Sequence, residues 1–121
     1  MMSETMSDAQ ENFAENSKIF RDLMLGFVKV HVLHHATIQP IYGSGFSAEL
    51  SKHGYRLSWG TLYPLLHSLE TEGLLDREER IVDGKVRKYY KITKRGRAAL
   101  AEARRKALEL VNEITENDEN G

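Results

Sequence analysis

The chain has 121 residues, 40% hydrophobic and 29% charged, which suffices for one globular domain with its own core. It contains no cysteine, which excludes a disulfide scaffold, a thiol nucleophile and a cysteine-ligated metal site. No run of about 18 uncharged apolar residues predicts a membrane span, and the acidic start is unlike a secretory signal, so we expect a cytoplasmic protein without a membrane partner.

The net charge of −1 conceals a strong segregation of charge along the chain. Residues 1–17 hold four acids and no base, and residues 107–121 hold five acids and no base. Residues 85–106 hold ten basic side chains against the single acid Glu102. Such a local basic segment is typical of a phosphate-binding surface, and a solvated helix face is the alternative.

The first part of the chain predicts an acidic tail followed by a helix. Residues 1–17 are small, polar and acidic, so we expect a disordered tail. From Ile19 to Leu33 apolar residues recur at spacings of three and four, which predicts a helix with one face on a core. The apolar band broadens towards Leu33, which indicates burial on more than one side. Pro40 and Gly43 bracket a loop.

Two more helices are expected before the pattern changes. The first is short, covers residues 44–53 and is stopped by Gly54. The second covers residues 58–72, with Ser58 as its N-cap and four leucines at helical spacing. Pro64 lies inside it and costs one backbone hydrogen bond.

The third helix is followed by a predicted β-hairpin. Residues 74–81 and 86–92 read as two strands, and Asp83-Gly84 between them is a strong signal for a tight turn. Thr93 then caps a long last helix. The chain order of three helices, a hairpin and a helix predicts a mainly α fold with a small β-hairpin (α+β), a winged helix-turn-helix with a C-terminal dimerisation helix.

The last helix carries an apolar seam that a domain of this size leaves without a partner. Its residues recur in a heptad-like pattern, which indicates a subunit interface and therefore a homodimer. We expect that interface to contain Phe20, Leu100, Ala103, Ala107, Leu110, Val111 and Ile114. The expected division is thus a tail over 1–17, the winged helix over 18–93, the dimerisation helix over 94–116 and a second disordered tail over 117–121.

A helix-turn-helix places the start of its recognition helix in the major groove of double-stranded DNA. We therefore expect contacts from the start of the third helix, where hydroxyls, a glycine and free N–H groups meet phosphates or base edges. The expected residues there are Ser58, Trp59, Gly60, Thr61, Tyr63 and His67. As alternatives, Ser58 serves only as a cap and Tyr63 only packs on the wing.

The hairpin, or wing, is expected to bind the phosphate backbone or a minor groove with its long cations. These cations are Lys85, Arg87, Lys88 and, further along the strand, Lys91. Strand alternation places Tyr90 on the core side. The first strand mixes acids with bases, so DNA contact there is doubtful.

Residues 53–66, His-Gly-Tyr-Arg-Leu-Ser-Trp-Gly-Thr-Leu-Tyr-Pro-Leu-Leu, resemble the signature of the PadR family of bacterial transcriptional regulators. So do Leu69-Glu70 with the Glu72 to Leu75 run, and the stretch from Gly84 to Gly96. The resemblance covers about residues 20–115. It implies a dimeric winged-helix repressor with a DNA-reading third helix, a basic wing and a dimerising last helix. It also implies that a small molecule or another signal often relieves repression.

The chain departs from the family pattern at two places. Trp59 stands where the family often has a small residue or proline, and it stacks on a sugar or packs beside the wing. No aromatic residue follows Tyr90, so the last helix lacks the side chains with which some members hold planar compounds at the dimer centre. A small-molecule effector at the dimer interface would need Phe13, Phe20 or Phe27.

The remaining residues predict no catalytic or metal site and no cofactor. His31 and His35 share a helix face and resemble a metal-binding pair, with His34 beside them, but no third ligand is evident nearby. No nucleophile with a base and no glycine-rich phosphate loop is present, which excludes most enzyme classes. The sequence therefore predicts a sequence-specific DNA-binding regulator, most simply a repressor on an inverted repeat. The alternative is a winged-helix protein-interaction module.

Overall fold

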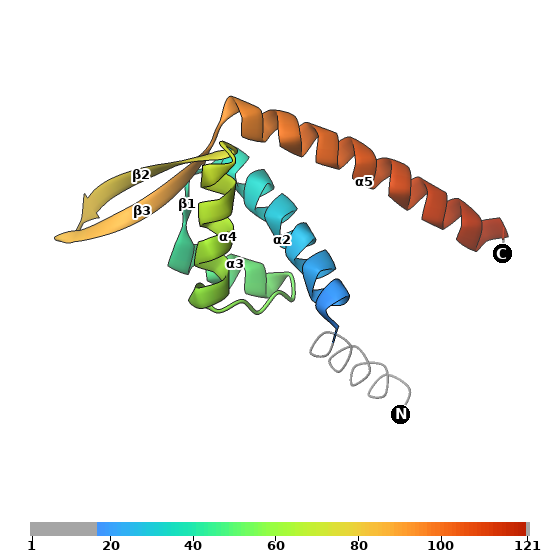
Figure 1. Ribbon diagram of the computed structural model, residues 1–121, viewed down its shortest axis with the longest axis horizontal. Helices are drawn as coiled ribbons and strands as arrows, with labels where there is room; N and C mark the ends of the chain where they lie inside the picture. Colours follow the sequence, from blue (N-terminus) through green and yellow to red (C-terminus); the bar gives the residue numbers. More distant parts are fainter. Residues whose placement is uncertain (1–16, 121) are drawn as a thin grey trace.

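The computed structural model describes the backbone of residues 17–120 and side-chain exposure for residues 17–116. Its elements are α2 (Lys18–Ile38), β1 (Ile41–Tyr42), α3 (Gly43–Lys52), α4 (Trp59–Thr71), β2 (Leu75–Val82), β3 (Lys85–Ile92) and α5 (Lys94–Asn120), shown in Figure 1. This order confirms the predicted winged helix-turn-helix. The expected N-terminal tail lies outside the described residues except for Ser17, whose hydroxyl accepts from the Phe20 N–H at 3.1 Å and caps α2.

The sheet has three strands, so the prediction of a lone hairpin was incomplete. Strand β3 lies between β1 and β2, and both neighbours run antiparallel to it. In β1, Ile41 pairs with Tyr90 and Tyr42 pairs with Tyr89. The segment between Pro40 and Gly43, expected as a loop, therefore forms a sheet edge. Two residues are too short for an alternating pattern, and this strand exists because β3 offers it a partner.

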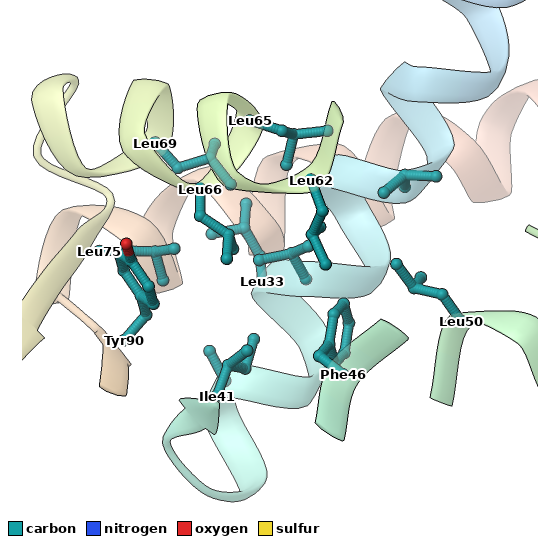
Figure 2. Packing of buried hydrophobic residues seen from close by; sticks show 13 residues of the cluster. Leu33, Ile41, Phe46, Leu50, Leu62, Leu65, Leu66, Leu69, Leu75 and Tyr90 are labelled. Carbon is teal, nitrogen blue, oxygen red and sulfur yellow. The ribbon is translucent and has the colours of Figure 1, made fainter. Parts of the chain in front are cut away.

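Leucines on one side of α4 form the centre of the core. Leu62, Leu65, Leu66 and Leu69 are all buried, and they pack on the inner faces of α2 and α3 (Figure 2). The sheet contributes Ile41, Leu75 and Tyr90, and the remaining core residues are Val28, Val32, Leu33, Ala36, Phe46 and Leu50. These contacts fix the inner side of α4 in the core and leave its outer side able to contact another molecule.

The β2–β3 hairpin extends from this core as a wing (Figure 1). Asp83 and Gly84 have φ of 53° and 75°, the left-handed conformation at both central positions that a type I′ turn requires. The hydrophobic side chains next to the turn have no core to enter: Ile81 is 79% exposed and Val86 is 63% exposed. The tip of the wing is therefore free to approach another molecule.

Helix α5 leaves the domain as a long arm (Figure 1). Thr93 fixes its start, because the Thr93 hydroxyl donates to the Gly73 carbonyl at 2.6 Å and accepts from the Gly96 N–H at 2.9 Å. The helix runs through residues 117–120, so the second tail expected from 117 is corrected to helix. The physical reason is that no proline or glycine occurs between Gly96, in the first turn, and Gly121.

Candidate nucleic-acid interface

The first turn of α4 presents polar groups that the helix itself does not use. Ser58 occupies the N-cap position as predicted, but its side chain makes no capping hydrogen bond. Its hydroxyl lies 3.3 Å from the Thr61 hydroxyl instead. Trp59 and Gly60 are exposed, and their N–H groups precede the first helical hydrogen bonds, which Thr61 and Leu62 donate to the Ser58 carbonyl. Hydroxyls and N–H donors therefore gather at one exposed helix start.

Trp59 packs against the start of α3. A Cβ atom on Gly43 would collide with the six-membered ring of Trp59, so this close contact requires glycine at position 43. The Trp59 and Tyr63 ring centroids are 5.3 Å apart, and Trp59 remains 48% exposed. Trp59 therefore packs on α3 and beside Tyr63, with about half of its surface exposed, and the two alternatives for Trp59 stay predictions.

Tyr63 joins the recognition helix to the wing. Lys88 Nζ donates to the Tyr63 hydroxyl at 3.3 Å and lies 5.1 Å from the centre of its ring. His67 stacks on the other side of Tyr63 at 6.4 Å and its Nδ1 lies 3.6 Å from the Glu70 carboxylate. Tyr63 thus packs on the wing, and Lys88 bridges the two elements of the candidate interface.

Two arginines lie on the other face of the wing, each over a tyrosine ring. Arg87 lies 4.8 Å from the ring centre of Tyr42, and Arg80 lies 4.5 Å from that of Tyr89. Arg80 and Arg87 are direct partners across the strands. Like charges at paired positions destabilise a sheet, and the aromatic rings offset part of that cost. Arg80 also forms an ion pair with Glu78 at 3.0 Å, whereas Arg87 has no carboxylate partner among the described residues.

Lys91 differs from the cations near the tip because its charge is matched within the sheet. Its Nζ lies 2.8 Å from the Glu78 carboxylate. The hydrogen bonds from Lys91 and Arg80 hold the pKa of Glu78 below its usual value. Lys85, by contrast, is exposed at the tip and has no acidic partner in the described part of the chain. Among the described residues of the wing, the positive charge without an acidic partner therefore lies near the turn.

An open groove of about 440 Å³ separates the start of α4 from the wing. Its lining combines aromatic, small and basic side chains: Tyr42, Gly43, Ser44, Trp59, Tyr63, Val86, Arg87 and Lys88. Four of the ten predicted DNA-binding residues line this groove: Trp59, Tyr63, Arg87 and Lys88. The sequence did not indicate Tyr42, Gly43 and Ser44 as site residues, because Tyr42 belongs to a strand that the pattern does not predict and the other two follow it directly.

The residues expected at a subunit interface lie in two environments. Leu100 packs against the core of its own chain, and Phe20 and Ala103 are half-buried. The others are exposed along one side of α5: Ala107, Leu110, Val111 and Ile114. Helix α2 adds a second exposed apolar stripe of Ile19, Leu23, Phe27 and Val30, opposite its core face.

Three comparisons with known proteins decide the family. Residues 32–102 match the model of the transcriptional regulator PadR-like family. The chain belongs to the PadR-like family of transcriptional regulators. Its resemblance to that family in sequence is thereby confirmed, as is the absence of an enzymatic role, since the family and the relatives found are transcriptional regulators.

The PadR-like assignment is supported by individual relatives. The chain is 50% identical over 94 residues to the transcriptional regulator Rv3488 of Mycobacterium tuberculosis, covering 78% of this chain and 88% of that one. A PadR family regulator from Eggerthella lenta has a similar structure, with a TM-score of 0.74 and 30% identity over 89% of this chain and 94% of its own. A PadR-like regulator from Bacillus cereus gives a TM-score of 0.69 and 29% identity, covering 83% of this chain and 98% of that one.

Regulators of the PadR-like family bind DNA. Within residues 17–120, no helix is long and apolar enough to cross a membrane.

Proposed function

We propose that this PadR-like protein is a repressor in the cytoplasm that binds an inverted-repeat operator as a two-fold dimer. Each subunit places the start of α4 in the major groove of one half-site, with the wing beside it on the backbone. Bound there, the dimer blocks access of RNA polymerase to the promoter. The observation that carries this proposal is the joint surface of hydroxyls at the exposed start of α4 and cations on the wing that have no acidic partner among the described residues.

The two halves of this surface have different tasks. Ser58 and Thr61 have hydroxyls at an exposed helix start, which suits contacts to base edges or to a fixed phosphate. Lys85 and Arg87 have long cationic side chains without an acidic partner among the described residues, which suits backbone phosphates of any sequence. Lys88 is held by Tyr63 and sets the spacing between helix and wing.

The proposed dimer uses the exposed apolar sides of α5 and α2. Leu110, Val111 and Ile114 are each more than half exposed in the single chain, as is Leu23 of α2. Contiguous apolar surface of this kind marks an interaction site in a soluble protein. A second copy covers both stripes at once when α5 of one subunit crosses α2 of the other. The same interface is where a small-molecule effector would act, by changing the distance between the two α4 helices.

A selection from random duplex DNA with the purified protein at moderate salt tests the proposal. Enrichment of one inverted repeat, with half-sites spaced by about one or more helical turns, supports it. Tight but salt-sensitive binding to every sequence contradicts sequence-specific regulation and indicates an architectural DNA-binding protein. No binding to any duplex would favour a protein-interaction module instead.

A further inference from the structure

Three histidines from separate parts of the sequence come together on the side of α2. His31 and His35 lie one turn apart on α2, and His53 occupies the C-cap of α3. The ring centroids of His31 and His53 are 4.7 Å apart, and those of His35 and His53 are 6.1 Å apart. One nitrogen of each ring lies within 4.8 Å of one nitrogen of both others. His53 is the third ligand that the sequence did not reveal.

The surrounding structure holds these rings in place. The His53 N–H donates to the Leu50 carbonyl at 3.0 Å, which fixes the end of α3. Tyr55 meets the His31 ring edge-on with a centroid separation of 5.3 Å, and Phe46 meets the His35 ring in the same manner at 5.4 Å. The cluster is therefore assembled by the packing of α2 on α3 and not by one flexible loop.

The ring nitrogens of His31, His35 and His53 have no hydrogen-bond partner among the described residues. Burial, followed by the neighbouring His53, holds the pKa of His31 below its usual value, and burial followed by His34 does the same for His35. Neutral imidazoles keep a lone pair on one nitrogen. One potential ligand nitrogen from each of the three half-buried or exposed rings lies within 4.8 Å of the other two.

We propose that His31, His35 and His53 bind one transition-metal cation of the zinc class. Imidazole nitrogen is a preferred ligand of Zn²⁺, Cu²⁺ and Ni²⁺. A tetrahedral zinc ion with N ligands at about 2.0–2.1 Å places those nitrogens about 3.4 Å apart. The separations of up to 4.8 Å close to that value by small rotations of the imidazole rings. Three protein ligands leave a fourth position for water or for an exchangeable ligand.

Glu49 supplies negative charge beside the cluster. Lys52 holds the Glu49 carboxylate at 3.2 Å and keeps its pKa below the usual value, with smaller contributions from His35 and His53. A carboxylate near the ligands compensates part of the charge of a divalent cation.

The proposed metal site connects α2 with the helix-turn-helix. His31 and His35 lie on α2, the helix that also carries the exposed stripe proposed for dimerisation. His53 begins the turn between α3 and α4, the two helices of the helix-turn-helix. A bound cation therefore ties this turn to α2.

Calorimetric titration of the metal-free full chain, without a polyhistidine tag, tests the site with ZnCl₂. We expect one Zn²⁺ per subunit, and the Co²⁺-loaded protein should show the strong visible absorption of tetrahedral cobalt. Because loss of an outer partner of a ligand already costs about 10–100-fold in affinity, His53→Ala should weaken Zn²⁺ binding by at least about 100-fold. His35→Gln should have an effect of the same size.

His34→Ala is the matched control, because His34 neighbours the cluster but is exposed and lies outside it. This variant should bind Zn²⁺ like the wild type. His53 is also exposed, so His53→Ala should retain the wild-type circular dichroism spectrum. Absence of Zn²⁺ binding by the wild type, undiminished binding by a folded His53→Ala variant, or an equal loss in His34→Ala would each overturn the proposal.

Discussion

Replacing Arg87 by alanine should weaken DNA binding and make the affinity depend less steeply on salt concentration. Each phosphate contact contributes about 0.9 to the slope of log Kobs against log salt concentration for duplex DNA. Arg87 lies on the wing without a carboxylate partner in the described chain, and a two-fold dimer has two copies of it. Arg87→Ala should therefore reduce the magnitude of the slope by about 1.8.

This slope corresponds to a measurable loss of affinity. Contacts that depend on counterion release vanish near 1 M salt, so the variant should bind about 60-fold more weakly at 0.1 M, or about 2.5 kcal/mol. A fourfold rise in salt should weaken the wild type about 12-fold more than the variant. Fluorescence anisotropy with a labelled duplex at four or five salt concentrations measures both quantities. The loss should be the same on operator and on unrelated DNA.

Two comparison variants make the Arg87 experiment decisive. Lys91 is paired with Glu78 at 2.8 Å, so Lys91→Ala should leave the slope within about 0.5 of the wild-type value. Thr61→Ala removes a hydroxyl at the start of α4 and should cost about 1–3 kcal/mol on the operator but little on unrelated DNA. Equal changes of slope for Arg87→Ala and Lys91→Ala would refute the assignment of the phosphate contact to the unpaired cation. Equal loss of operator preference for Arg87→Ala and Thr61→Ala would refute the division of tasks.

Two further predictions concern packing. Gly43→Ala should push the Trp59 ring aside and lower the free energy of unfolding by about 1–3 kcal/mol. Trp59 is the only tryptophan, so its fluorescence reports both the displacement of its ring and the unfolding of the protein in urea. In the control variant Gly45→Ala the new Cβ meets Tyr42 no closer than 3.7 Å, so neither the Trp59 fluorescence nor the free energy of unfolding should fall. Ala107→Glu places charge in the proposed α5 interface and should weaken dimerisation by roughly 100-fold or more in sedimentation velocity. Asn112→Glu places the same charge on the opposite side of that helix and should leave dimerisation unchanged. If Ala107→Glu remains as dimeric as Asn112→Glu, the proposed interface is refuted.

The main elements of the fold were predictable because their signals are local. Leucines at helical spacing, the change of period after Gly73, and Asp83-Gly84 each act on neighbouring residues, and the structure has the helix and the hairpin they predict. Strand β1 was missed because two residues carry no period of their own. Helix α5 was cut short at 116 because its polar end resembles a tail, although no glycine or proline follows Gly96 within the helix.

Candidate site residues within one helix or strand could be predicted from the sequence, but contacts between different helices and strands could not. The start of α4 and the wing could be predicted as a DNA-binding surface because each lies on one continuous segment. Spacing in the sequence does not show that Trp59 rests on Gly43, or that Glu78 neutralises Lys91. His53 is similarly distant from His31 and His35 in the chain, and only the packing of α3 on α2 brings the three rings together.

The central claim is that the surface of α4 and the wing reads a particular sequence. The most direct test is the ratio of dissociation constants for the selected operator and for a scrambled duplex of equal length, measured with the wild-type protein at physiological salt. We expect the operator to bind at least about 1,000-fold more tightly. Equal affinities for the two duplexes would contradict the claim.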